Sequence, residues 1–249
     1  MRAVWFCSLV LGLSVGGWSR ADDSAEAKAV IDKAVKAMGG ADKVAKFKTG
    51  SFRGKGSGQE GGKEISVTME GLWQGLSQYR IDAEATHDGR TEKVLIVVNG
   101  DKGWAKARDK TEDAPEGVAV LIKNGLYTLR TPLLLPEWKD DKAFRLTHLG
   151  ELNINGKTAV GVSAVHKDMK DVSLYFDKDT GLPLKSEVHL TEPQGKEITL
   201  EFYYDDYKEK DGVKSPSKVT AKFEDKEFVM EFAELKAKDK IEESEFAKP

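Results

Sequence analysis

The chain has 249 residues, of which 39% are hydrophobic and 33% are charged. Its 39 Lys and Arg nearly balance its 42 Asp and Glu, so the formal net charge is only −3. This composition excludes a polytopic membrane protein, a disordered acidic tail and a basic nucleic-acid-binding protein, and it suits one large globular domain.

The N-terminal segment has the pattern of a secretory signal peptide. A basic start precedes an apolar run from Ala3 to Gly17, and the small residues Ser19 and Ala21 occupy the positions that a signal peptidase reads. A membrane anchor is the alternative, but the run is shorter than the roughly 20 apolar residues that span a bilayer. We therefore predict a signal peptide over residues 1–21, a periplasmic or extracellular location, and contact with a membrane that is peripheral at most. Residues 22–249 are predicted to form a single domain.

The only cysteine, Cys7, lies inside this apolar run. A chain cleaved after Ala21 would have no thiol, which excludes disulfides, thiolate metal ligands and a cysteine nucleophile from the mature domain. Such a domain must be stabilised by its hydrophobic core, and its length makes that feasible.

One helix is predicted at the start of the mature domain. Asp23 or Ser24 can cap it, and Gly39-Gly40 ends it in the position where glycine relieves left-handed strain. Its apolar residues recur at helical spacing: Val30, Ile31, Ala34, Val35 and Met38. From Lys48 onward the apolar period changes from helical to two.

Most of the remaining chain alternates between apolar and polar residues, which is typical of strands with one dry face. The clearest segments are 65–73, 79–83, 160–164, 172–176, 198–204, 219–223 and 228–232. Turn sequences such as Asn155-Gly156 and Asp211-Gly212 separate them closely enough for hairpins, and the helices that parallel strands would need are missing. We predict a mainly β (α+β) fold with about 11 or 12 antiparallel strands.

An apolar insert interrupts this alternation of apolar and polar residues. Residues 115–130 have helical spacing and begin with a proline, which suits a first helical turn. Residues 131–138 are apolar and contain two prolines, which argues for a loop. We predict a helix and a loop that cover either the open face of the sheet or a ligand cavity.

Chemical motifs give no catalytic site. Gly56–Gly61 matches G-x-G-x-x-G, but a strand follows it where a dinucleotide site needs a helix, so a hairpin loop is predicted. Asp177–Gly181 lacks the distal Glu of a calcium loop. The histidines have no zinc-ligand spacing: His87, His148, His166 and His189. No G-x-S-x-G nucleophile motif occurs, and no spacing brings two carboxylates together as a general acid and base. The basic residues alternate with acids and form no track for phosphates. We predict no cofactor, no metal, no nucleic-acid partner and no enzymatic activity; a hydrolase of unrecognised type is a minor alternative.

Several motifs occur in an order that resembles the outer-membrane lipoprotein carrier (LolA/LolB-like) superfamily. Leu72-Trp73 precedes the strand Tyr79-Arg80-Ile81, and Asn99–Trp104 forms an Asn-Gly-Asp-Lys turn that leads to an aromatic residue. Leu174–Pro183 is similar to the hairpin of this family that ends in Thr-Gly-Leu-Pro, and Tyr204–Pro216 is similar to secreted members. The resemblance covers most of residues 24–249.

The resemblance implies a strongly curved antiparallel sheet that forms an unclosed half-barrel. The N-terminal helix and the mid-chain helix and loop would cover its concave face, with an acyl chain or another lipid held between sheet and helices. The candidate cavity residues are Trp73, Ile81, Ile96, Trp104, Val118, Leu121, Ile122, Leu133, Leu134 and Leu135. The alternative is that these side chains pack against one another as a closed core.

The sequence departs from the dedicated carrier at one place. The carrier has a basic residue, tied to its lid, and then a proline soon after Leu-Trp, whereas Gln74–Gln78 contains neither. The resemblance therefore implies a general secreted member. We expect a monomeric, non-enzymatic domain that binds a lipid, an acyl chain or a lipoprotein. The alternative is a protein-interaction or envelope-sensor module with a closed core, which would bind an envelope protein.

Overall fold

A computed structural model describes residues 20–249, so most of the predicted signal peptide lies outside the described residues and its cleavage stays a prediction. The strands are β1 (Thr49–Glu60), β2 (Lys63–Gln74), β3 (Gln78–His87), β4 (Arg90–Asn99), β5 (Lys102–Ala107), β6 (Lys110–Asp113), β7 (Phe144–Ile154), β8 (Lys157–His166), β9 (Val172–Asp177), β10 (Pro183–Thr191), β11 (Glu197–Lys210), β12 (Val213–Phe223) and β13 (Lys226–Ala237). The α-helices are α1 (Arg20–Ala37), α2 (Ala41–Val44), α3 (Glu116–Leu129) and α4 (Leu135–Asp140), and the 3-10 helices are η1 (Ala45–Lys48), η2 (Thr131–Leu134) and η3 (Glu243–Phe246).

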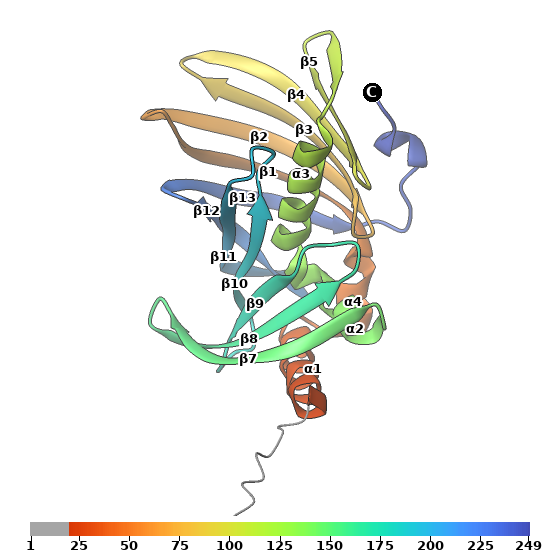
Figure 1. The fold of residues 1–249 in the computed structure, drawn as a ribbon, viewed down its shortest axis with the longest axis vertical. Coiled ribbons are helices and arrows are strands. Elements are labelled where there is room, and N and C mark those ends of the chain that lie inside the picture. The colour runs from red at the N-terminus through yellow and green to blue at the C-terminus, as the bar shows by residue number, and fades with distance from the viewer. Residues whose placement is uncertain (1–19) are drawn as a thin grey trace, which may run out of the picture.

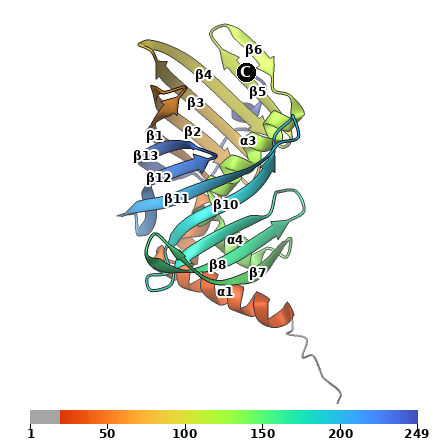
Figure 2. The same cartoon turned by 60° about the vertical axis from the view of Figure 1, so that its left-hand side comes forward.

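All the described strands belong to one antiparallel sheet, in the order β6-β5-β4-β3-β2-β1-β13-β12-β11-β10-β9-β8-β7. Consecutive hairpins build each half, and β1 pairs with β13 where the halves meet. The sheet curves around α3 (Figure 1), and its edge strands β6 and β7 do not pair with each other (Figure 2). The predicted mainly β, unclosed antiparallel sheet is confirmed. The predicted strand number is too low, since the sheet has 13 strands; the short edge strand β6 consists of polar residues and shows no alternation.

α1 buries the apolar residues that the sequence predicts. Ile31, Ala34 and Met38 are fully buried, and the helix packs against β7 and α4. It includes Arg20, the first described residue, and so extends before the predicted caps. At its end Gly39 has φ +118°, and a Cβ there would lie 2.0 Å from the carbonyl oxygen of Gly212, so glycine is required for both the backbone conformation and the close approach of the β11–β12 turn.

The inner face of the sheet, which faces the helices, carries few side chains along β1. The register places Gly50, Gly54, Gly56 and Gly58 on this face, with Phe52 as the only side chain among them. The strand continues to Glu60 and the turn is Gly61-Gly62, so the predicted hairpin loop at 56–61 is mostly strand. Gly50 leaves room for the ring of Trp73, Gly56 and Gly58 leave room for that of Phe228, and Gly54 lies close to the backbone of β13.

Helices cover part of the inner face. α3 crosses its middle and packs against β5 on one side and β10 on the other, while α1, α2 and α4 lie at the end near β7 and β8 (Figures 1 and 2). Residues 131–138 form η2 and α4, which corrects the predicted loop. Each proline lies in the first turn of its helix, where the missing N–H has no intrahelical partner to lose. No helix in the described part of the chain is long and apolar enough to cross a membrane.

Candidate ligand cavity

An apolar cavity of about 60 Å³ lies between the inner face of the sheet and the helical segment that covers it. Strands β1, β2, β3, β12 and β13 form its wall, and the end of α3 together with η2 closes it. The lining residues are Phe52, Leu72, Trp73, Tyr79, Ile81, Leu126, Leu129, Arg130, Pro132, Leu133, Pro216, Val219, Phe232 and Leu235. Arg130 is the one charged residue among them.

Three predicted cavity residues line this space: Trp73, Ile81 and Leu133. Two others, Leu134 and Leu135, are fully buried in the main hydrophobic core beside it. Leu121 lies in a separate surface depression formed with β10 and the β8–β9 loop. The remaining predicted residues are half-buried outside the cavity: Ile96, Trp104, Val118 and Ile122.

Trp104 lies on the outer face of the sheet because of the register of β4 and β5. It pairs with Val97, whereas its neighbour Gly103 pairs with Val98 on the inner face. α3 approaches closely here: a Cβ at position 103 would lie 2.9 Å from the Cβ of Ala119. The inner position therefore requires glycine, and the tryptophan falls on the opposite face.

Sequence reasoning missed several lining residues. Tyr79 shares the alternation of Ile81 and could have been included. Leu126 and Leu129 lie in the apolar insert, where helical spacing alone did not separate the cavity side from the core side. Arg130 gave no signal, because one arginine among 39 Lys and Arg is not distinctive.

The Arg130 guanidinium is buried at the junction of α3 and η2, with only 7% of the residue exposed. Its Nη1 donates to the carbonyl oxygen of Gly75 at 3.0 Å, and its Nη2 lies 3.5 Å from that of Phe47. Its Cζ lies 4.8 Å from the ring centroid of Trp73 and 5.4 Å from that of Tyr79, both cation–π distances. Burial lowers the pKa of this guanidinium. Within residues 20–249 no carboxylate forms an ion pair with it.

The middle of α3 is held at both sides of the half-barrel. Lys123 Nζ lies 2.5 Å from a carboxylate oxygen of Asp101 in the β4–β5 turn and donates to the carbonyl oxygen of Asp168 in the β8–β9 loop. The side-chain oxygen of Asn124 accepts a hydrogen bond from the backbone N–H of Lys170 in the same loop. The helix therefore bridges two turns that lie far apart in the sheet order.

Tyr204 on β11 holds the C-terminal end of α3. Its hydroxyl donates to the carbonyl oxygen of Thr128 at 3.0 Å and lies 2.6 Å from the hydroxyl of Ser186 on β10. The phenol is fully enclosed, and this burial raises its pKa. The contact joins the covering helix to the sheet beside the cavity.

We expect Tyr204→Phe to lower the free energy of unfolding by about 1 kcal/mol, because it removes a buried hydrogen bond while the Thr128 carbonyl keeps the hydroxyls of Thr131 and Ser186 as donors. Urea unfolding of the variant and the parent protein measures the difference. Tyr203→Phe is the matched control: within the described residues its hydroxyl bonds only to the partly exposed carboxylate of Glu201, so we expect a change within about 0.5 kcal/mol. Equal effects would contradict the assigned role.

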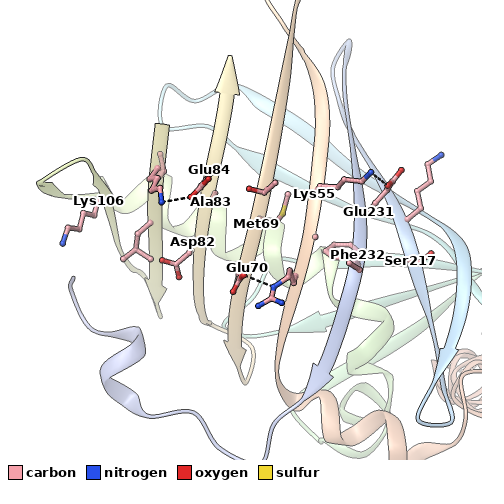
Figure 3. A pocket seen from close by; sticks show the side chains of 18 of the residues that line it. Lys55, Met69, Glu70, Asp82, Ala83, Glu84, Lys106, Ser217, Glu231 and Phe232 are labelled. Carbon is pink, nitrogen blue, oxygen red and sulfur yellow. Dashed lines mark hydrogen bonds and ion pairs between the residues drawn. The ribbon is translucent and has the colours of Figure 1, made fainter. Parts of the chain in front are cut away.

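The outer face of the sheet carries a wider, charged trough of about 1040 Å³ (Figure 3). Its side chains form cross-strand ion pairs: Arg53 with Glu70 at 2.8 Å, Lys55 with Glu231 at 3.0 Å and Lys93 with Glu84 at 2.7 Å. These side chains are mostly exposed, so each pair contributes little to stability. The trough has the character of a solvated face with both signs of charge.

Within residues 20–249 no group of three or more His, Cys, Asp or Glu side chains is arranged to hold a metal ion. Three of the four histidines have other contacts: His148 Nδ1 lies 3.0 Å from a carboxylate oxygen of Glu26, and the His166 ring packs against Phe144. His189 contacts the hydroxyl of Thr199.

Comparison with solved structures identifies similar folds. A LolA superfamily protein from Nitrosomonas europaea is 12% identical over 89% of this chain and 97% of that one, with a TM-score of 0.55. A DUF1329 family protein from Desulfovibrio piger is 14% identical with the same coverage and a TM-score of 0.54. A domain assigned to outer membrane lipoprotein sorting from Vibrio parahaemolyticus is 12% identical over 90% and 97% of the two chains, with a TM-score of 0.51. No family model matches the sequence, and no curated protein sequence matches it.

Proposed function

We propose that this chain, which has a LolA-like fold, is an exported, non-enzymatic domain that binds an acyl chain, as a free lipid or attached to a lipoprotein, beneath α3. The observation that supports this most directly is the apolar cavity between the inner face of the sheet and the α3–η2 segment. The signal-peptide pattern of residues 1–21 supports export.

The volume of the cavity sets a condition on binding. At about 60 Å³ it is several times smaller than the roughly 300–1,000 Å³ of typical ligand sites. An acyl chain must therefore displace side chains that now fill the space, above all Leu126, Leu129 and Leu133 of the covering segment. Each buried CH₂ of the ligand contributes about 0.8 kcal/mol, which offsets the exposure of these leucines. We propose that the α3–η2 segment moves as a lid, and the structure corresponds to its closed position.

The first experiment asks whether lipid is present and whether it binds. Native mass spectrometry of the purified protein, followed by organic extraction, should show a co-purifying lipid. The delipidated protein should bind a fluorescent fatty acid saturably. If no lipid co-purifies and the fatty acid does not bind, the acyl-chain function is wrong.

We expect Leu129→Asp to weaken fatty-acid binding at least about tenfold, because it places a carboxylate in the lining of an apolar site. The matched control is Leu121→Asp on the same helix. Leu121 is also half-buried but lies outside the cavity. The fatty-acid binding constant of Leu121→Asp should therefore change less than about twofold. Fluorescence titration measures both, and circular dichroism verifies that both variants are folded. Similar losses in the two variants would argue against binding in this cavity.

A second candidate is a protein-interaction or envelope-sensor module. The observation that favours it is the small volume of the cavity, which is compatible with a closed core. On this hypothesis a partner protein would contact the sheet from outside, and Leu129→Asp would not affect that contact. Retained partner binding by a protein that binds no lipid would support this candidate.

A further inference from the structure

The cavity contains a feature that a purely apolar ligand does not explain. A site that only held a hydrocarbon chain would need no charge, yet Arg130 lines it. A buried guanidinium without a carboxylate is costly, because desolvation is offset only where hydrogen bonds and an opposite charge replace water. The two carbonyl contacts and the Trp73 and Tyr79 rings supply part of this compensation.

The compensation is incomplete at two atoms. Nε of Arg130 is buried and has no hydrogen-bond partner, and Nη2 reaches the carbonyl oxygen of Phe47 only at 3.5 Å, the limit of a hydrogen bond. The charge of Glu137 on α4 partly offsets the effect of burial on the pKa of Arg130, but this carboxylate lies 3.6 Å from Lys48 Nζ and forms no ion pair with the guanidinium. The described side chains therefore leave donor capacity on this guanidinium unused.

We propose that the ligand of this cavity is an anionic amphiphile whose carboxylate or phosphate group binds Arg130 while its acyl chain lies along the inner face of the sheet. This inference rests on the proposed function and specifies its ligand. A guanidinium binds such groups through two parallel N–H···O bonds in its own plane. The aromatic contacts of Trp73 and Tyr79 orient that plane.

The same group links the ligand to the covering segment. Arg130 directly follows α3, and its bond to Gly75 ties the end of this helix to the β2–β3 turn. An anion that takes up the free Nε and the weakly bound Nη2 would compete with the Phe47 carbonyl rather than with the shorter Gly75 bond. Arg130, which would bind the anion, is therefore adjacent in sequence to Leu129, which the acyl chain would displace.

The test compares amphiphiles of equal chain length that differ in the head group. Delipidated protein is titrated below the micellar range with palmitate, with 1-palmitoyl lysophosphatidic acid and with hexadecanol. We expect at least one of the anions to bind about 10- to 100-fold more tightly than hexadecanol, the gain of a buried charge-assisted contact. The stronger of the two anions distinguishes a carboxylate from a phosphate head group.

A substitution then assigns the preference to one residue. Arg130→Met keeps an unbranched side chain without charge and should reduce the preference for the anion to less than about threefold. Arg53→Met removes the same charge from the outer face, where Arg53 pairs with Glu70, and should retain the full preference.

The outcomes separate this inference from the proposed function. If hexadecanol binds as tightly as both anions, the cavity binds lipid but the anionic ligand is wrong, and this comparison needs only the parent protein. If Arg130→Met folds and keeps the preference, the assignment to Arg130 is wrong. If none of the three amphiphiles binds, the proposed function itself fails.

Discussion

Replacement of Trp73 by alanine is expected to lower the free energy of unfolding by about 3–5 kcal/mol. The side chain is almost fully buried in the wall of the cavity, and its indole N–H donates to the carbonyl oxygen of Phe47 at 2.8 Å. Its removal opens a cavity in the core and also removes an aromatic contact of the Arg130 guanidinium. Urea unfolding followed by circular dichroism measures the loss.

Trp104→Ala is the matched control for this prediction. Both tryptophans lie on strands and were predicted to line the cavity, but Trp104 is half-buried on the outer face. We expect its replacement to cost less than about 2 kcal/mol and to leave fatty-acid binding unchanged. If Trp104→Ala destabilises the protein as much as Trp73→Ala, the difference in burial between the two faces does not govern stability here.

Leu134→Asp is expected to lower the free energy of unfolding by more than about 4 kcal/mol, enough to unfold a domain of ordinary stability. Leu134 is fully buried in the main core, so the variant loses apolar packing and buries a carboxylate without a partner. Thermal unfolding measured by circular dichroism should show no cooperative transition. A loss of lipid binding in this variant would report unfolding, so Leu129→Asp is the appropriate probe of the cavity.

Leu134→Met separates size from charge at this position. Methionine keeps the apolar volume, and we expect a cost below about 1.5 kcal/mol with an intact cooperative transition. A folded Leu134→Asp variant of near-parent stability would show that η2 is not packed as the structure has it.

The direction of strand side chains was predictable because alternation has a period of two. Ile81 and Trp73 were assigned to the dry face on this basis, and both lie on the inner face. Alternation could not predict the side-chain directions of Leu133 to Leu135, because these are three consecutive apolar residues. Across η2 and the start of α4 successive side chains point in different directions, so Leu133 lines the cavity, whereas Leu134 and Leu135 pack in the core without lining it.

The position of Arg130 beside the β2–β3 turn could not be predicted from the order of residues in the sequence. The stretch Gln74–Gln78 has no basic residue, although the resemblance to the carrier leads one to look for it there. The structure brings a guanidinium to this same turn from the end of α3, 55 residues further along the chain, where Nη1 of Arg130 binds the carbonyl oxygen of Gly75. Motif reading compares positions along one strand and therefore misses a charge supplied by another element.

The sequence by itself determined the mainly antiparallel sheet, the buried face of α1 and the presence of an apolar segment in the middle of the chain that covers the sheet. These features depend on local periodicity and on turn chemistry, which neighbouring residues specify. Only the tertiary structure decided the volume of the cavity, the outward position of Trp104 and the place of Arg130 within an apolar lining. Those depend on how closely α3 approaches the sheet, and this distance results from packing between segments far apart in the chain.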